Sequence, residues 1–308
     1  MTQTLAPFCA AVDWGTSSFR LWLLDEAGAV LAESRSGEGM MHCASGAGFQ
    51  PVLDAHLAKA GAPADLPVVI CGMAGARQGW LEAPYVPAPA ALSELPFNAA
   101  RIADATADIR ILPGISLNDA SFPNVMRGEE TQLLGTVEAL GSALVCMPGT
   151  HSKWVRVEAG AVTRFSTFMT GELFSVLTRH AILQHAVDAE SVVKSDDPAF
   201  LAALERAIAQ PDASLSGLFG VRAAQLLGYE TRDEGAAHLS GLLIGGEVAG
   251  ARSLYGADAA VTLIASGGVS ALYETALARA GFTVTLIDAE TASRNGLCRS
   301  ARQIWDVK

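Results

Sequence analysis

The chain has 308 residues, of which half are apolar and only 17% are charged. This length is enough for one large domain or two ordinary ones, and the composition argues against long disordered segments. Acidic residues outnumber basic ones by 32 to 21, a net charge of −11, and no basic stripe runs through the sequence, so a nucleic-acid partner is not expected. An anionic ligand would have to be bound by individually placed Arg and Lys side chains.

The sequence does not indicate a membrane or secreted protein. Its longest apolar runs fall short of the ~20 residues that a membrane span needs, and residues 1–7 carry no basic residue ahead of their apolar stretch. The five cysteines are widely spaced, and neither a disulfide framework nor a CxxC metal site fits them. We therefore expect a cytoplasmic protein with reduced cysteines, and the sequence leaves open whether it forms a homo-oligomer.

One pattern of short strands and tight turns occurs twice. The first copy has a strand at 8–12, a turn at 14–17, and further strands at 19–24 and 30–33. The second copy begins about 135 residues later, with a strand at 143–147, a turn at 148–152, and strands at 154–157 and 162–168. Tight turns containing Gly are the usual connectors of adjacent antiparallel strands. The repeat predicts an internal duplication.

Alternating helices and strands follow each copy. After the first copy we expect a helix at 50–59, a strand at 68–71, a helix at 97–105 and a strand at 109–112. After the second copy we expect helices at 172–185 and 236–254, a strand at 261–265, a helix at 271–280 and a strand at 283–287. An additional helical insertion is expected at about 198–229 of the second half.

These elements predict an α/β fold of two duplicated ribonuclease H-like domains, each with a mixed five-stranded sheet and flanking helices. The first domain would span residues 1–140, and the second would span 141–289. A C-terminal helix at about 290–308 would pack back on the first domain. This arrangement resembles the actin-like ATPases, in which two such domains face each other across a nucleotide cleft and each Gly-containing turn approaches the phosphates. An ordinary α/β enzyme whose two turns match by chance is the alternative.

Both turns have the features that phosphate binding uses. Gly15 lets the backbone approach a phosphate closely, Thr16 and Ser17 offer hydroxyl donors, and successive N–H groups can form an anion-binding concavity. Asp13 ends a buried strand and is well placed to hold Mg²⁺ through water. A capped β-turn would look the same, but the second turn repeats the chemistry. Its candidate residues are Gly149, Thr150, His151, Ser152 and Lys153.

A third Gly-containing turn, at Gly267 and Gly268, lies between a strand and a helix. In the actin-like fold this position meets the adenosine, although Gly-Gly is more often only a tight connection. Other nucleotide motifs are missing from the sequence: there is no GxxxxGK[ST] loop, and no GxGxxG follows a strand. These absences disfavour a P-loop kinase and a dinucleotide-binding enzyme.

Two adjacent carboxylates, Glu129 and Glu130, precede an apolar helical run at 133–140. Acidic residues also favour the first turn of any helix, so simple helix capping is the alternative interpretation. Exopolyphosphatases and heat-shock chaperone ATPases resemble this chain in carrying a Glu here, where it acts on the attacking nucleophile. Either carboxylate could accept a proton from an acceptor hydroxyl. Neighbouring helical side chains point about 100° apart, so we expect only one of them to do so.

Five segments of the chain carry a resemblance to a known family: AVDWGTSSFRLWLLD (11–25), CGMAGARQGWLEAPYVP (71–87), MRGEETQLLG (126–135), PGTHSKWV (148–155) and FSTFMTGELFSVL (165–177). They resemble the 2-dehydro-3-deoxygalactonokinase family, a family of sugar-acid kinases in the actin-like superfamily. The resemblance implies transfer of the γ-phosphate of ATP, with Mg²⁺, to the C6 hydroxyl of 2-dehydro-3-deoxy-D-galactonate.

A keto-acid substrate would need a partner for its carboxylate, and Arg77 lies in the Gly-rich loop that follows the strand at 68–71. Gln78 and Trp80 could add a hydroxyl contact and an apolar wall. Arg77 could equally be a surface residue, and Trp80 a core aromatic. Three further residues flank a second loop suited to sugar hydroxyls: Thr167, Thr170 and Glu172.

The chain departs from many actin-like kinases at the start of the second phosphate loop. Those kinases have an Asp there, whereas this chain has Met147 and Pro148. Either Asp13 alone supports the metal ion, or His151 and Lys153 neutralise phosphate charge instead. A phosphohydrolase acting on polyphosphate or a nucleotide, and a kinase for a related 2-keto-3-deoxy sugar acid, remain alternatives. A sugar-sensing regulator or chaperone-like ATPase is a weaker one.

Overall fold

The computed structural model describes residues 6–103, 105–256 and 260–305. Residues 1–5 and 104 of the expected first domain, and residues 306–308 of the expected C-terminal helix, therefore lie outside the described residues. The chain forms two compact units. The first comprises the residues up to Ser142, the segment Val157–Arg164 and the residues from Ala289 onwards. The second comprises Ala143–Arg156 and Phe165–Asp288.

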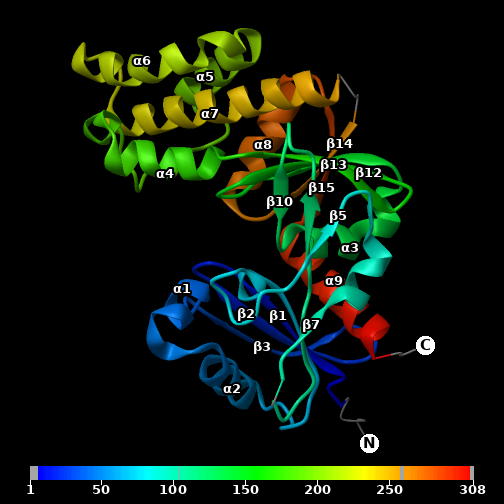
Figure 1. Ribbon diagram of the computed structural model, residues 1–308. Helices are drawn as coiled ribbons and strands as arrows, with labels where there is room; N and C mark the ends of the chain where they lie inside the picture. The colour runs from blue at the N-terminus through cyan, green and yellow to red at the C-terminus, as the bar shows by residue number, and fades with distance from the viewer. Residues whose placement is uncertain (1–5, 104, 257–259, 306–308) are drawn as a thin grey trace, which may run out of the picture. The chain divides into compact units, whose positions relative to one another are not determined.

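A six-stranded mixed sheet with the order β3-β2-β1-β4-β8-β7 forms the centre of the first unit (Figure 1). Its strands are β1 (Cys9–Trp14), β2 (Phe19–Leu24), β3 (Val30–Ser36), β4 (Val68–Gly72), β7 (Ala100–Arg101) and β8 (Ile109–Ile111). Strand β1 is antiparallel to β2 and parallel to β4, which is in turn parallel to β8. The central strands are buried on both faces, as their continuous apolar sequences require.

Helices cover both faces of this sheet because alternate residues of each strand point to opposite sides. On one face, helix α2 (Phe49–Ala60) packs through Val52 and Leu53 against strand residues such as Val12. On the other face, helix α9 (Ala289–Ile304) packs through residues such as Leu297 against the strands.

Helices α3 (Glu129–Leu140) and α9 cross at two glycines. A Cβ on Gly296 would lie 1.9 Å from the carbonyl oxygen of Thr131, and one on Gly135 would lie 2.0 Å from that of Ala292. No side chain larger than hydrogen fits at these points, so the two backbones touch. This contact holds the first turn of α3 in place against the sheet.

The first unit also contains a small three-stranded sheet that the sequence did not predict. Its order is β10-β9-β5, with β5 (Tyr85–Pro87), β9 (Gly114–Leu117) and β10 (Asn124–Met126). Short helical segments complete the unit: Met40–His42 (α1), Cys43–Ala47, Met73–Gly75 and Leu92–Asn98. The expected helix at 97–105 is wrong. Ala100–Arg101 instead pairs as strand β7 with β8, and the N–H of Ile102 bonds the carbonyl oxygen of Ile109.

The sheet of the second half repeats the strand order of the first. Its strands are β11 (Ala143–Met147), β12 (Ser152–Glu158), β13 (Ala161–Phe168), β14 (Ala260–Ala265) and β15 (Thr283–Asp288). They run in the order β15-β14-β11-β12-β13, which corresponds to β8-β4-β1-β2-β3. The predicted duplication is therefore confirmed. The count of five strands is wrong by one, since the short strands β7 and β6 (Ala90–Ala91) each extend an edge.

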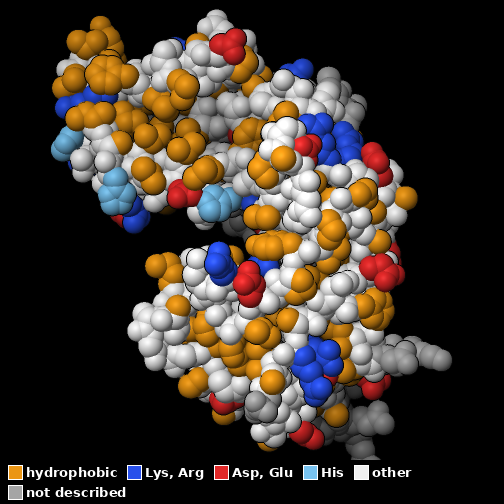
Figure 2. All heavy atoms as spheres, viewed as in Figure 1, with side chains coloured by type: hydrophobic (Ala, Val, Ile, Leu, Met, Phe, Trp, Pro, Cys, Tyr) orange, Lys and Arg blue, Asp and Glu red, His pale blue; other side chains and the backbone are white. Residues whose placement is uncertain are grey.

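Helices fill the rest of the second unit (Figure 1). They are α4 (Thr170–His180), α5 (Pro198–Ala209), α6 (Ser214–Leu226), α7 (Arg232–Tyr255) and α8 (Gly268–Arg279), with short segments at Ile182–His185 and Pro211–Ala213. The N–H of Glu234 donates to the Thr231 hydroxyl at the start of α7, which caps this helix. Helices α5 and α6 occupy the expected insertion, and exposed apolar side chains gather over α6 (Figure 2). No helix among the described residues is long and apolar enough to span a membrane.

Candidate active site

The first candidate phosphate loop leaves the carboxyl end of β1 beside the carboxyl end of β4. Asp13 pairs with Cys71, and Trp14 with Gly72, so the loops after both strands start at the same edge of the sheet. Ligands of open α/β sheets bind at this edge. The side chains of Thr16 and Ser17 are exposed there. They are therefore not packed into the core that surrounds strand β1.

The segment before and within α1 supports this loop from behind. The N–H of Met40 donates to the carbonyl of Gly15 over 2.9 Å, and the indole N–H of Trp14 donates to the carbonyl of Glu38 over 3.0 Å. The Glu38 carboxylate in turn lies 2.9 Å from Nε2 of the buried His56. The sequence analysis did not single out Glu38 or His56. The only sequence features that mark them are that Glu38 lies between two glycines and that His56 lies on an apolar helix.

Asp13 lies in a partly desolvated position at the start of the loop. Burial raises the pKa of its carboxyl, while Arg20, 3.8 Å away, and hydrogen bonds from Ser293 and Cys71 lower it. The side chain is 22% exposed, so it remains accessible. A carboxylate with this much burial would be stabilised by a hydrated cation beside it. The residues present therefore fit a water-mediated Mg²⁺ contact.

The two glutamates of α3 differ in environment. Glu130 is 1% exposed, and both of its carboxyl oxygens lie 2.8 Å from the N–H of Gly128. Burial, with a smaller contribution from Glu129, raises the pKa of Glu130 to about 7. Glu129 is only partly buried, and it accepts a hydrogen bond from the N–H of Arg127 over 3.0 Å. A Cβ on Gly128 would lie 3.5 Å from Gly72 Cα, so this helix start adjoins the end of β4.

The predicted substrate loop follows β4 in the same unit. Arg77 and Gln78 are exposed, as a ligand contact requires. Trp80 stacks on Phe49 with ring centroids 6.0 Å apart and meets Trp14 edge-on at 6.1 Å. Its ring thus packs on the core of the first unit, next to Trp14 at the end of β1. The first unit therefore gathers Asp13, the first loop, the α3 glutamates and this loop at one sheet edge.

The second candidate phosphate loop has an equivalent place in the second unit. It follows β11, which is parallel to β14. Gly149, Thr150 and His151 are exposed. A Cβ on Gly171 would lie 2.6 Å from the carbonyl oxygen of Gly149, so the first turn of α4 packs directly on the loop. The N–H of Glu172 donates to the carbonyl of Thr150 over 2.9 Å, which fixes the loop on this helix.

The remaining residues predicted near this loop are divided between surface and interior. The Glu172 carboxylate lies 2.5 Å from Nε2 of His151, and both side chains are solvent-accessible. Thr167 is partly buried near the end of β13. Ser152 and Lys153, by contrast, are buried in strand β12, because strand β12 begins at Ser152, two residues earlier than expected.

Thr170 is also buried, and its hydroxyl donates to the Glu247 carboxylate of α7. Its hydroxyl is thus directed into the protein, whereas the sequence analysis expected it to meet sugar hydroxyls.

A cavity of about 310 Å³ adjoins the second loop in the second unit. Gly149, Gly171 and Gly268 line it, so two of the predicted Gly-containing turns meet there. Its walls are mainly apolar, with contributions from Phe174, Val192, Val193, Leu243, Ile244 and Leu272. An apolar cavity lined by glycine turns suits a flat ring such as adenine.

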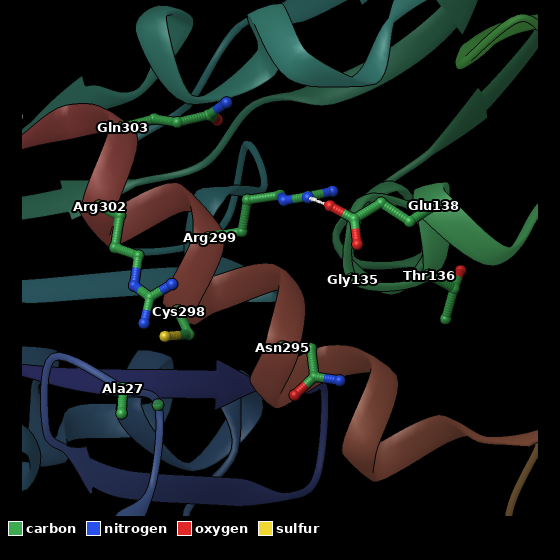
Figure 3. A pocket seen from close by; sticks show the side chains of 10 residues that line it. Ala27, Gly135, Thr136, Glu138, Asn295, Cys298, Arg299, Arg302 and Gln303 are labelled. Carbon is green, nitrogen blue, oxygen red and sulfur yellow. Dashed lines mark hydrogen bonds and ion pairs between the residues drawn. The ribbon is translucent and has the colours of Figure 1, made fainter. Parts of the chain in front are cut away.

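A larger cavity of about 600 Å³ lies elsewhere in the first unit, between α3, α9 and the turn after β2 (Figure 3). Arg299 reaches across it to Glu138, and its other polar lining residues include Arg302, Gln303 and Asn295. None of the predicted site residues lines it. Within the described parts of the chain, no three His, Cys, Asp or Glu side chains cluster so as to hold a metal ion by themselves.

The duplicated sheet with a Gly-containing loop at the carboxyl end of its first strand defines the class of this protein: it has the fold of the actin-like ATPases. A solved activator of 2-hydroxyisocaproyl-CoA dehydratase from Clostridium difficile, described with bound ADPNP, shares this fold. Its TM-score is 0.53 at 13% identity, over 97% of this chain and 98% of that chain.

Comparison with sequence families then places the chain within this class. It belongs to the 2-keto-3-deoxy-galactonokinase family, whose sequence profile matches residues 13–300. It is 54% identical over 307 residues to a probable 2-dehydro-3-deoxygalactonokinase of Rhizobium meliloti (strain 1021), covering 99% of this chain and 100% of the relative. It is 37% identical over 287 residues to the 2-dehydro-3-deoxygalactonokinase of Escherichia coli (strain K12), covering 93% and 95%.

A crystal structure from Sinorhizobium meliloti, assigned provisionally as a 2-dehydro-3-deoxygalactonokinase, matches with a TM-score of 0.94 and 53% identity. That match covers 97% of this chain and 100% of the solved chain.

Proposed function

We propose that this protein is a kinase that transfers the γ-phosphate of ATP to the C6 hydroxyl of 2-dehydro-3-deoxy-D-galactonate. The observation that carries the proposal is family membership over residues 13–300. The gathering of phosphate-type loops and two glutamates at sheet edges supports it. Because ATP is the donor, we propose the cytoplasm as the compartment of the reaction.

Each unit has a candidate phosphate loop for ATP. We assign phosphate contacts to the half-buried Gly15 and the exposed Thr16 and Ser17 in the first unit, and to the exposed Gly149, Thr150 and His151 in the second. The 310 Å³ cavity next to Gly268 would take the adenine ring, with Gly267 at its approach. Asp13 would hold Mg²⁺ through water, and the ion would neutralise charge on the phosphates. We assign Ser152 and Lys153 a supporting role, because both are buried beneath the loop.

Of the two adjacent carboxylates, we propose Glu129 as the group that contacts the acceptor hydroxyl. A base must reach the proton that it accepts, and Glu129 is partly exposed whereas Glu130 is 1% exposed. The Arg127 N–H fixes one oxygen of the Glu129 carboxylate and so orients it. Glu130 would keep the Gly128 turn in shape through its 2.8 Å hydrogen bonds.

The sugar acid would be recognised by exposed polar groups. Arg77 is suited to grip the carboxylate of the keto acid, with Gln78 and the Trp80 ring beside it. We assign Thr167 and Glu172 to sugar hydroxyls in the second unit. The buried Thr170 would instead support the loop, since its hydroxyl donates to Glu247.

The test is release of ADP from ATP and Mg²⁺ with a panel of 2-keto-3-deoxy sugar acids. We expect ADP release to require the galactonate-derived acid, with epimers reacting more slowly. ADP release at full rate without any sugar acid would show a phosphohydrolase and refute the kinase assignment. Preference for the gluconate-derived epimer would correct the substrate.

A pair of variants tests the base. Glu129→Gln should lower kcat by roughly 10²–10⁴ with little change in the KM for ATP. Glu130→Gln should lower kcat less and change stability more. The reverse order of the two kcat values would move the base to Glu130.

A further inference from the structure

Helix α7 carries a carboxylate deep inside the second unit. Glu247 is 3% exposed and is the one acidic residue between positions 235 and 251 of the sequence. Burying a carboxyl group is costly unless several hydrogen bonds compensate, so its presence calls for a physical reason. Glu247 is not among the site residues inferred from the sequence.

Three donors from three different elements converge on this carboxylate. Its Oε1 accepts a hydrogen bond from the indole N–H of Trp154 in β12 over 2.9 Å. Its Oε2 accepts from the Tyr273 hydroxyl of α8 over 2.6 Å and from the Thr170 hydroxyl at the start of α4. One side chain of α7 thus joins β12, α8 and α4. Burial raises the pKa of Glu247, and these hydrogen bonds oppose that rise.

The connection continues from Tyr273 to the second loop. The Tyr273 hydroxyl lies 3.1 Å from the Ser152 hydroxyl, and the Gly149 N–H donates to Ser152 Oγ over 3.4 Å. A carboxylate only accepts hydrogen bonds, so Tyr273 must donate to Glu247. The Tyr273 oxygen can then accept from Ser152, whose own oxygen accepts the Gly149 N–H. Because a backbone N–H only donates, Glu247 sets the direction of the hydrogen bonds of the Tyr273 and Ser152 hydroxyls alone.

A second connection runs through Thr170. This residue begins α4, and the next residue, Gly171, packs so closely on Gly149 that a Cβ would lie 2.6 Å from its carbonyl oxygen. The Glu247–Thr170 bond thus holds the helix turn on which the loop rests. Tyr273, Thr170 and Gly149 also line the 310 Å³ cavity. Both connections from Glu247 end at the wall of that cavity.

We propose that Glu247 is a positioning residue for nucleotide binding, which holds the second phosphate loop through Tyr273 and Ser152 and through Thr170. The proposal rests on the proposed function, in which this loop and cavity bind ATP. Glu247 itself touches no substrate.

Glu247→Gln is the sharpest perturbation because it preserves size. The amide oxygen can still accept from Trp154, but the amide nitrogen must then face the Tyr273 and Thr170 hydroxyls as a donor. Both hydroxyls would have to turn, and Tyr273 could no longer accept from Ser152 while it donates to residue 247. Tyr273→Phe breaks the same chain one step later. Thr178→Ala is the matched control, since its buried hydroxyl donates to the carbonyl of Phe174 within α4 and belongs to neither connection.

The readouts are the Kd for ADP by calorimetry, the KM for each substrate, and the midpoint of thermal unfolding. We expect Glu247→Gln and Tyr273→Phe each to weaken ADP binding and raise the KM for ATP about tenfold, the equivalent of one net hydrogen bond. The KM for the sugar acid should change less than twofold. The double variant should resemble Glu247→Gln, because Tyr273 carries one of the two connections that start at Glu247. Thr178→Ala should lower only the unfolding midpoint.

Unchanged ADP affinity in folded Glu247→Gln and Tyr273→Phe, with lowered stability alone, would reduce Glu247 to a structural role and overturn the proposal. If Glu247→Gln does not fold, Tyr273→Phe decides the question by itself. Wild-type protein that binds no ADP would refute the proposed function, and the positioning role with it. If the wild type binds ADP and the variants bind it with the same affinity, only the positioning role would be refuted.

Discussion

Replacing Gly296 by alanine tests whether the contact between α3 and α9 positions the α3 glutamates. The new Cβ would lie 1.9 Å from the carbonyl oxygen of Thr131, whereas ordinary contacts begin at 3.4 Å, so the helices must separate by about 3.4 − 1.9 = 1.5 Å. Overpacking of this kind typically costs ~1–3 kcal/mol, against a helix-propensity gain of ~1 kcal/mol for Gly→Ala. We expect a net loss of up to roughly 2 kcal/mol in the free energy of unfolding.

Activity should fall as well, because Thr131 follows Glu130 directly in the chain. A misplacement of about 1 Å can cost ~10²-fold in rate. The matched control is Gly220→Ala in the middle of α6, where a Cβ would meet nothing within 4 Å. That variant keeps the propensity gain without the clash, so it should be up to ~1 kcal/mol more stable than wild type and fully active.

Urea unfolding followed by circular dichroism, together with kcat from ADP release, measures both effects. If Gly296→Ala matched the stability and kcat of wild type, the close helix crossing would not constrain α3 and the reasoning would be refuted. If the variant lost stability but kept its kcat, the close packing of α3 and α9 would be supported, but its effect on catalysis would be refuted.

Three further predictions concern single site residues. Burial raises the pKa of Glu130 from 4.5 to about 7 in the folded protein, so the folded state keeps this proton at a higher pH and the free energy of unfolding falls as pH rises between these values. Glu130→Gln should remove that fall. Free energies of unfolding measured from pH 5 to 8 check this, and parallel curves for wild type and variant would contradict it. Arg77→Ala should raise the KM for the sugar acid about tenfold to a hundredfold, the scale of a charged hydrogen bond, and an unchanged value would remove Arg77 from the site. Gly171→Ala places a Cβ 2.6 Å from the Gly149 carbonyl oxygen and should raise the KM for ATP; equal KM values for this variant and Gly220→Ala would contradict the close packing.

Local sequence patterns predicted the duplication because each repeat is built from short apolar runs that end at Gly-containing turns. Such patterns act over a few residues, so β2 (Phe19–Leu24) has its expected bounds. The candidate loops follow from the same logic, since Gly15 and Gly149 mark the turns after β1 and β11.

Elements decided by distant partners were missed. The segment at 97–105 contains alanines that suit a helix, yet Ala100 pairs with Ile111 and becomes part of a sheet edge. Here tertiary pairing outweighed helix propensity, which is worth only a fraction of a kcal/mol per residue. Strand β12 likewise starts at Ser152, and this earlier start buries two residues that the turn pattern had placed beside phosphate.

Sequence by itself thus determined the repeat, the strands that carry it and the loops that end them, because those features depend on neighbouring residues. Tertiary structure alone decided which polar side chains are exposed and which face the core. Glu247 and Glu129 are both helical glutamates in the sequence, but one accepts hydrogen bonds from β12, α4 and α8 while the other remains partly exposed. The partners of Glu247 lie 26 to 93 residues away along the chain, so only folding brings them within hydrogen-bonding distance.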